Sequence, residues 1–131
     1  MRHKIYWGDT HTNTHLRHLD QIDDIFDEAA RILDFLAIAY YPFERDDVNG
    51  IHVESWGQRP HFLAGWDVIC RTVAAHNAPG KFTTFPGYEW HGDRTQWGDH
   101  NVFYNGDSGP LLASETVADL FGELRKLGGI A

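Results

Sequence analysis

Phe35-Leu36-Ala37-Ile38-Ala39-Tyr40 is an unbroken apolar run. A run of this length without alternation is typical of a strand buried on both faces of a parallel sheet. Upstream of it, apolar residues recur at helical spacing from Ile22 to Leu33, and Asp20 is a good N-cap for the predicted helix. Before that helix, Lys4–Trp7 is predicted to be a short strand that Gly8 ends.

Downstream of the apolar run the alternation of strands and helices continues. A third helix is predicted to begin at Ser114 as its cap and to end at Gly128 as its C′ residue. The remaining predictions are a long polar loop over Pro42–Pro60, a helix over about Phe62–Asn77, a strand within Lys81–Tyr88, a short strand at Val102–Tyr104 and the start of another at Gly129–Ala131.

This order of elements predicts a parallel α/β architecture, either a barrel or a doubly wound sheet. In both, ligands bind beyond the carboxyl ends of the strands. The predicted fold ends at a strand, and a half-built barrel would leave edge strands unpaired. We therefore expect residues 1–131 to form a single incomplete domain, completed by downstream sequence or by another chain.

Composition argues against several kinds of partner. The formal charge is −8 and the basic residues are scattered, so a surface for nucleic acid or anionic membrane is not expected. No signal peptide is visible, and no apolar stretch approaches the roughly 20 residues of a membrane span, so we expect a cytoplasmic protein. Cys70 is the only cysteine and is predicted to be a buried small hydrophobe.

Histidine is the unusual residue, with nine copies, several of them in polar clusters. The first cluster follows the first predicted strand. Asp9, His11, Asn13 and His15 are spaced two apart, so on an extended segment all four could face one metal site. A polar loop that satisfies its own backbone groups is the alternative for this cluster.

Two further clusters lie next to later strands, one after a predicted strand and one before the next. Glu89, in Pro86-Gly87-Tyr88-Glu89-Trp90-His91, could bridge metal ions or act as a general base, or it could simply be a solvated loop carboxylate. Asp99-His100-Asn101 directly precedes Val102, and taken alone it is a weak indication of a site.

Together these clusters resemble the PHP superfamily of metal-dependent hydrolases, and most closely a large PHP-like family of poorly defined function. The resemblance implies a distorted seven-stranded, TIM-like β/α barrel with Zn, Mn or Fe ions and phosphoester hydrolysis as the usual chemistry. The matching stretches, which run in family order, are Tyr6-Trp7-Gly8-Asp9-Thr10-His11, Leu33–Ala39, Phe85-Pro86-Gly87-Tyr88-Glu89-Trp90 and His100-Asn101-Val102-Phe103-Tyr104.

Carried over by this resemblance, His11, Glu89 and His100 would be metal ligands, with Glu89 in a bridging position. Asn13 stands where the family has a second histidine, and Tyr40-Tyr41 stand where it has Asp-His. Amide and phenol oxygens are poorer zinc ligands than imidazole, so at least one metal is expected to be lost. His15 is a possible replacement ligand.

The leading hypothesis is a phosphoesterase or related hydrolase that acts on a small phosphorylated molecule with one or two bound ions. In it, Asp9 would orient a ligand histidine or bind directly, and Tyr40 or Tyr41 would hydrogen-bond the substrate. The alternative is a degenerate relative that binds a ligand or partner without turnover. A third possibility is a carbohydrate surface formed by Trp56, Trp90 and Trp97.

Overall fold

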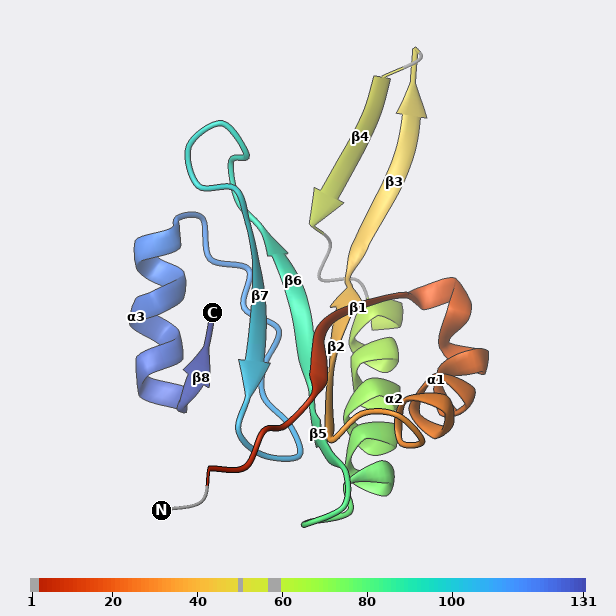
Figure 1. Cartoon of the computed structure of the whole chain (residues 1–131). Helices are drawn as coiled ribbons and strands as arrows, with labels where there is room; N and C mark the ends of the chain where they lie inside the picture. The colour runs from red at the N-terminus through yellow and green to blue at the C-terminus, as the bar shows by residue number, and fades with distance from the viewer. Residues whose placement is uncertain (1–2, 50, 57–59) are drawn as a thin grey trace.

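A computed structural model describes residues 3–49, 51–56 and 60–131. They form a mixed α/β fold with a six-stranded open sheet and a separate two-stranded hairpin (Figure 1). In chain order the elements are β1 (Gly8–His15), the 3-10 helix η1 (Leu16–Gln21), α1 (Ile22–Ala29), β2 (Phe35–Tyr41), β3 (Phe43–Val48), β4 (Ile51–Trp56), α2 (Pro60–His76), β5 (Thr83–Phe85), β6 (Gly87–His91), β7 (Asp99–Tyr104), α3 (Val117–Leu127) and β8 (Gly129–Ile130).

The sheet is mixed rather than parallel throughout. Its order is β1-β2-β6-β7-β8, with β5 also paired to β2. β1, β5 and β6 each pair with β2 in parallel, as predicted, whereas β7 is antiparallel to β6 and β8 is antiparallel to β7. The expectation of a wholly parallel sheet is therefore wrong for the last two strands. Only a short loop joins β6 to β7, and such a connection produces an antiparallel pair.

β2 lies at the centre of the sheet, and the prediction from its apolar run is confirmed. Residues 36–41 are buried, and β2 has partners along both edges. The two faces of β2 nevertheless have different surroundings. Ile38 and Tyr40 belong to the main hydrophobic core, whereas the alternate residues Ala39 and Tyr41 do not.

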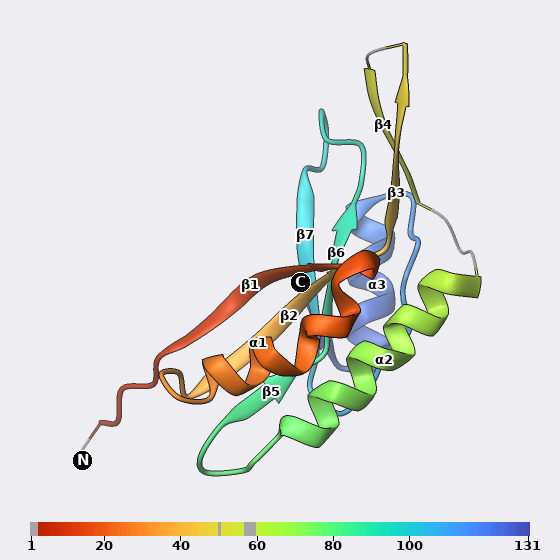
Figure 2. The same cartoon turned by 90° about the vertical axis from the view of Figure 1, so that its right-hand side faces the viewer.

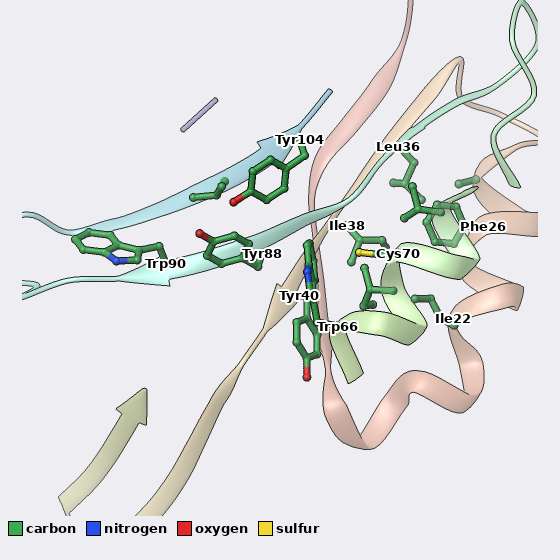
Figure 3. Close-up of a cluster of buried hydrophobic side chains, with 14 of the residues drawn as sticks. Ile22, Phe26, Leu36, Ile38, Tyr40, Trp66, Cys70, Tyr88, Trp90 and Tyr104 are labelled. Carbon is green, nitrogen blue, oxygen red and sulfur yellow. The ribbon is translucent and has the colours of Figure 1, made fainter. Parts of the chain in front are cut away.

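Within the described residues, α1, α2 and α3 all contribute to one core on one face of the sheet, which we call the helix face. Figure 2 shows α1 and α2 side by side across this face, and Leu120 and Leu124 of α3 join the same buried cluster. Trp66 of α2 stands beside Tyr40 in this core (Figure 3). Cys70 is buried there as predicted, and burial raises the pKa of its thiol to about 11.

The first strand begins later than predicted. Ile5, Tyr6 and Trp7 remain exposed, and the backbone N–H of Trp7 donates to the Asp34 carboxylate at 2.8 Å. β1 begins at Gly8, the residue that was expected to end a strand. A Cβ atom at Gly8 would lie 2.4 Å from the ring of Phe35, so this close pairing requires glycine.

The predicted loop over Pro42–Pro60 is also wrong for most of its length, because β3 and β4 form an antiparallel hairpin there. Val48 pairs with Ile51, which leaves Asn49-Gly50 as the connection. Asn-Gly is the strongest short sequence indication of a tight hairpin, and Asn49 has the positive φ of 54° that such turns use. Residues 57–59 of the predicted loop lie outside the described residues.

Three further boundaries differ from the predictions. α1 follows η1 directly, so Asp20 lies inside a 3-10 helix rather than at an N-cap. Thr116 caps α3 in place of Ser114, whose hydroxyl donates to Glu123 instead. Lys81–Tyr88 is divided into β5 and β6 at Pro86, which has no N–H for a ladder. Gly128 ends α3 with a left-handed φ of 71°, as predicted.

Candidate metal site

A polar surface lies on the sheet face opposite the helix face. Tyr40 pairs with Tyr88, and both belong to the core, so the next residue on each strand points to the other side. By the register, His15 is opposite Tyr41, Glu89 is opposite Asn101, and His91 is opposite Asp99. We call this surface the site face; it comprises His11, Asn13, His15, Tyr41, Glu89, His91, Asp99 and Asn101.

The side chains of the site face lie near the end of the sheet at which the parallel strands terminate. β1, β2 and β6 all terminate there, and the β3–β4 hairpin and the β6–β7 loop rise from the same end (Figure 1). The structure brings the first and second polar clusters together, because His11 lies 3.6 Å from Glu89.

Glu89 is the central carboxylate of this face, and it is only 8% exposed. Its Oε1 lies 2.8 Å from Nε2 of His91, within hydrogen-bond distance. Its Oε2 is buried without a hydrogen-bond partner, and the 3.6 Å to Nε2 of His11 is too long for a hydrogen bond. The hydrogen bond with His91 is the main reason that the pKa of Glu89 is lowered, although burial acts in the opposite direction.

His91 is well enclosed, with a side chain 6% exposed, against 58% for His11. Phe43, the first residue of β3, stacks on its ring at 4.0 Å, and Tyr41 meets it edge-on at 4.9 Å. Its Nδ1 lies 3.1 Å from Nη2 of Arg94 and 3.9 Å from Oδ1 of Asp99. Packing and hydrogen bonds therefore fix the orientation of this imidazole.

Asp9 and His11 are separated by a bulge in β1 that the spacing argument did not foresee. The register shifts between Asp9 and Thr12, so Asp9 pairs with Leu36 of the helix-face row. Asp9 accepts hydrogen bonds from the backbone N–H of His11 at 2.7 Å and from the Thr12 hydroxyl at 3.0 Å. The expectation that all four residues of the cluster face one way is wrong for Asp9, which instead stabilises the bulge that presents His11.

The other predicted residues divide between the two faces. Asn13 and His15 lie on the site face, and the ring of His15 is 4.6 Å from that of Tyr41. Tyr40 lies on the helix face, where its hydroxyl donates to the Phe62 carbonyl at 3.2 Å, so of the two tyrosines only Tyr41 belongs to the site face.

The structure does not bring His100 to Glu89. His100 pairs with Trp90, and its ring lies 5.8 Å from that of Trp90 and 5.7 Å from Phe121 of α3. Both neighbours belong to the helix side of the sheet. A one-residue difference along a strand reverses the face on which a side chain lies.

Sequence reasoning gave no role in the site to His91, Asp99 or Asn101, although they stood within the second and third clusters, and it did not consider Arg94. Strand alternation could have found the first of these, because His91 lies two residues after Glu89. Asn101 and Asp99 required the β6–β7 register, which no local pattern specifies. Oδ1 of Asn101 is, like Oε2 of Glu89, buried without a hydrogen-bond partner.

The residues present suit a divalent transition metal. Among the described residues, Glu89, His91 and Asp99 offer ligand atoms that lie within 4.8 Å of one another, and His11 approaches Glu89 from the other side. Imidazole and carboxylate together suit Zn, Mn or Fe. An orphaned, buried carboxylate oxygen such as Oε2 of Glu89 is the kind of group that a cation would satisfy.

The carbohydrate surface considered from the sequence has less support than the metal site. Trp90 is 1% exposed and its indole donates to the Ser114 carbonyl, so it is not available to stack on a sugar. Trp97 is half-exposed, and the side chain of Trp56 lies outside the described part of the chain.

No helix among the described residues combines the length and apolar character that crossing a membrane requires.

Comparisons with known proteins give one match. Neither the curated proteins nor the solved structures contain a significant match to this chain. One family model matches residues 16–120, most of the 131 residues, and it covers β2, β6 and β7 with Glu89 and His91. The chain therefore belongs to the family described as "Protein of unknown function (DUF3604)".

Proposed function

We propose that this protein is a metal-dependent hydrolase whose centre is formed by Glu89, His11 and His91. The observation that carries the proposal is the burial of Glu89 between two histidines, with Oε2 lacking a hydrogen bond. Burying an ionised carboxylate is costly unless a charge or donors compensate it. A bound cation at Oε2 would supply that compensation, and the imidazole of His11 is within reach as a ligand.

The chain's own residues have separate tasks in this proposal. A bound ion would polarise an ester oxygen and lower the pKa of a bound water. Asp9 holds the bulge that presents His11, whereas Phe43 and Tyr41 hold the ring of His91. Tyr41 also borders the site and could hydrogen-bond a substrate. Phosphoesters are the substrate class suggested by the resemblance to PHP hydrolases, with one or two Zn, Mn or Fe ions.

A larger β/α barrel is the architecture that we propose for the complete domain. The helices lie on one face of the sheet and the polar site on the other, at the ends of the parallel strands. This division agrees with a barrel whose helices are outside and whose site is at the carboxyl ends of its strands.

Metal content tests the proposal most directly. We expect about one or two ions per chain after loading and desalting, measured by elemental analysis, and a loss of at least about tenfold in affinity for His11→Ala and Glu89→Gln. His100→Asn is the matched control, because it changes a histidine on the helix face, and it should bind metal like the wild type. Negligible metal in the wild type, or a loss in His100→Asn equal to that in His11→Ala, would contradict the proposal.

The second candidate is a ligand-binding protein without turnover. The exposed Asn13 in place of an imidazole favours it, as does the closed set of contacts that links Glu89, His91, Arg94 and Asp99. Folded wild-type protein that binds a phosphorylated compound in calorimetry, yet contains no metal and hydrolyses no phosphoester in a substrate panel, would support this candidate over the first.

A further inference from the structure

Glu89 divides the site into two halves. Its Oε2 faces His11 and has no hydrogen bond, whereas its Oε1 is bonded to His91. Beyond His91, Asp99 completes the second half, so a carboxylate in the position of Glu89 could serve one cation on each side. The two halves differ in whether a cationic side chain already lies in them.

The second half already contains a cation, the guanidinium of Arg94. Its Nε lies 3.1 Å from Oδ1 and 3.0 Å from Oδ2 of Asp99, and its Nη2 lies 3.1 Å from Nδ1 of His91. It thus contacts two of the three residues that could otherwise hold an ion there. The first half has no such contact from a cationic side chain among the described residues.

The direction of its hydrogen bonds prevents His91 from acting as a metal ligand in this arrangement. A guanidinium has donors only, so Nδ1 of His91 must accept from Arg94. In a neutral imidazole the other nitrogen then carries the proton, and Nε2 donates to Oε1 of Glu89. Both ring nitrogens are therefore committed, and neither lone pair is directed at a metal.

The loop that carries Arg94 is itself well defined. The carboxylate of Asp93 accepts from the backbone N–H and hydroxyl of Thr95 at 2.9 and 2.6 Å, and from the side chain of Gln96 at 3.0 Å. These bonds fold residues 93–97 into a compact turn that places the Arg94 side chain beside Asp99. Because a guanidinium stays charged at any physiological pH, it would repel a divalent ion placed beside it.

We infer that Arg94 takes the place of a second metal ion, so that the site holds a single ion between His11 and Oε2 of Glu89. The inference rests on the proposed function, and it assigns Arg94 as the residue that sets the number of ions. Removing its charge should release His91, Asp99 and Oε1 of Glu89 to bind a second ion.

Zinc stoichiometry and affinity, measured by calorimetry and elemental analysis on the protein and four variants, test this inference. We expect about one ion per chain in the wild type and in Arg94→Lys, which keeps the charge, and about two in Arg94→Ala. His11→Ala should hold almost none. Adding Arg94→Ala to His11→Ala should restore about one ion, because the second half then becomes available.

Two results would overturn the inference while leaving the proposed function intact: two ions in the wild type, or one ion in folded Arg94→Ala. A wild type with no metal would end both. The Arg94 side chain is 53% exposed, so its removal leaves no buried cavity, and circular dichroism checks that the variants are folded. Arg94→Gln, neutral and of similar length, serves in place of Arg94→Ala if the latter unfolds, with the same expected stoichiometry.

Discussion

The helix face and the site face are formed by alternate residues of the same strands, yet the polar atoms on the two faces have different kinds of hydrogen-bond partner. On the helix face, polar groups of three buried aromatic side chains bond to backbone carbonyls: Tyr40 to Phe62, Trp66 to Gly109 and Trp90 to Ser114. The Thr14 hydroxyl, which pairs with Tyr40 on this face, is buried without a partner. On the site face, side chains bond to one another, and oxygens of Glu89 and Asn101 are buried without partners.

This difference indicates which face serves stability and which serves chemistry. A buried N–H or O–H proton that is donated to a fixed backbone carbonyl is not available to a ligand. An orphaned acceptor costs free energy in the folded state, and a ligand that satisfies it recovers that cost. Changes on the helix face should therefore alter the free energy of unfolding, whereas changes on the site face should mainly alter binding.

The largest effect is expected for Trp66→Ala. Trp66 is 4% exposed, packs against Tyr40, Tyr88 and Tyr104, and donates to the Gly109 carbonyl. Its removal should lower the free energy of unfolding by about 3–5 kcal/mol, measured by urea denaturation. If the variant remains folded, its metal affinity should match that of the wild type. A loss below about 1 kcal/mol would show that the helix face is not the main source of stability.

A smaller effect is expected for Tyr40→Phe, which removes one hydroxyl from the helix face. The variant leaves the Phe62 carbonyl without that donor, so the free energy of unfolding should fall by about 1 kcal/mol. Metal content should not change. If Tyr40→Phe instead lost metal while keeping its stability, the assignment of Tyr40 to the core rather than to the site would be wrong.

The smallest effect concerns acid. The pKa of Glu89 is lowered in the folded state, chiefly by its bond with His91. Its ionised form therefore contributes stability that is present above the ordinary pKa of 4.5 and is lost as the pH falls through the folded value. With a chelator present, the free energy of unfolding should fall more steeply below that pH in the wild type than in Glu89→Gln.

Glu28→Gln is the matched control for the acid experiment, because it removes an exposed carboxylate of α1. It should keep the wild-type slope of stability against pH. Equal slopes for the wild type and Glu89→Gln would mean that the contacts of Glu89 with His91 and His11 do not favour its ionised form.

Much of the fold was predictable, and the errors have local causes. The apolar run of β2 and the helical spacing in α2 and α3 led to correct elements, because burial of a whole strand or of one helix stripe leaves a direct mark in composition. The β3–β4 hairpin was missed because its polar strands suggested a loop, although Asn49-Gly50 indicated a turn.

The candidate site was predictable in its centre but not in its extent. Glu89 and His11 were identified from their positions after strands, and they do lie together. The predicted set also included Tyr40 and His100, which lie on the helix face, and it lacked His91 and Arg94. Single-residue differences in register separate the correct members from the incorrect ones.

Residue order alone determined that the chain combines strands and helices, that β2 is buried on both faces, and that histidines and carboxylates gather next to strands, because apolar periodicity and clustering are local properties. Only the tertiary structure decided which of those polar residues share a face. The bulge at Asp9, the pairing of Glu89 with Asn101 and the contact of Arg94 with His91 depend on backbone pairing and loop closure between separate segments. No local pattern specifies such pairing, because the side-chain period of two makes each one-residue shift reverse the face.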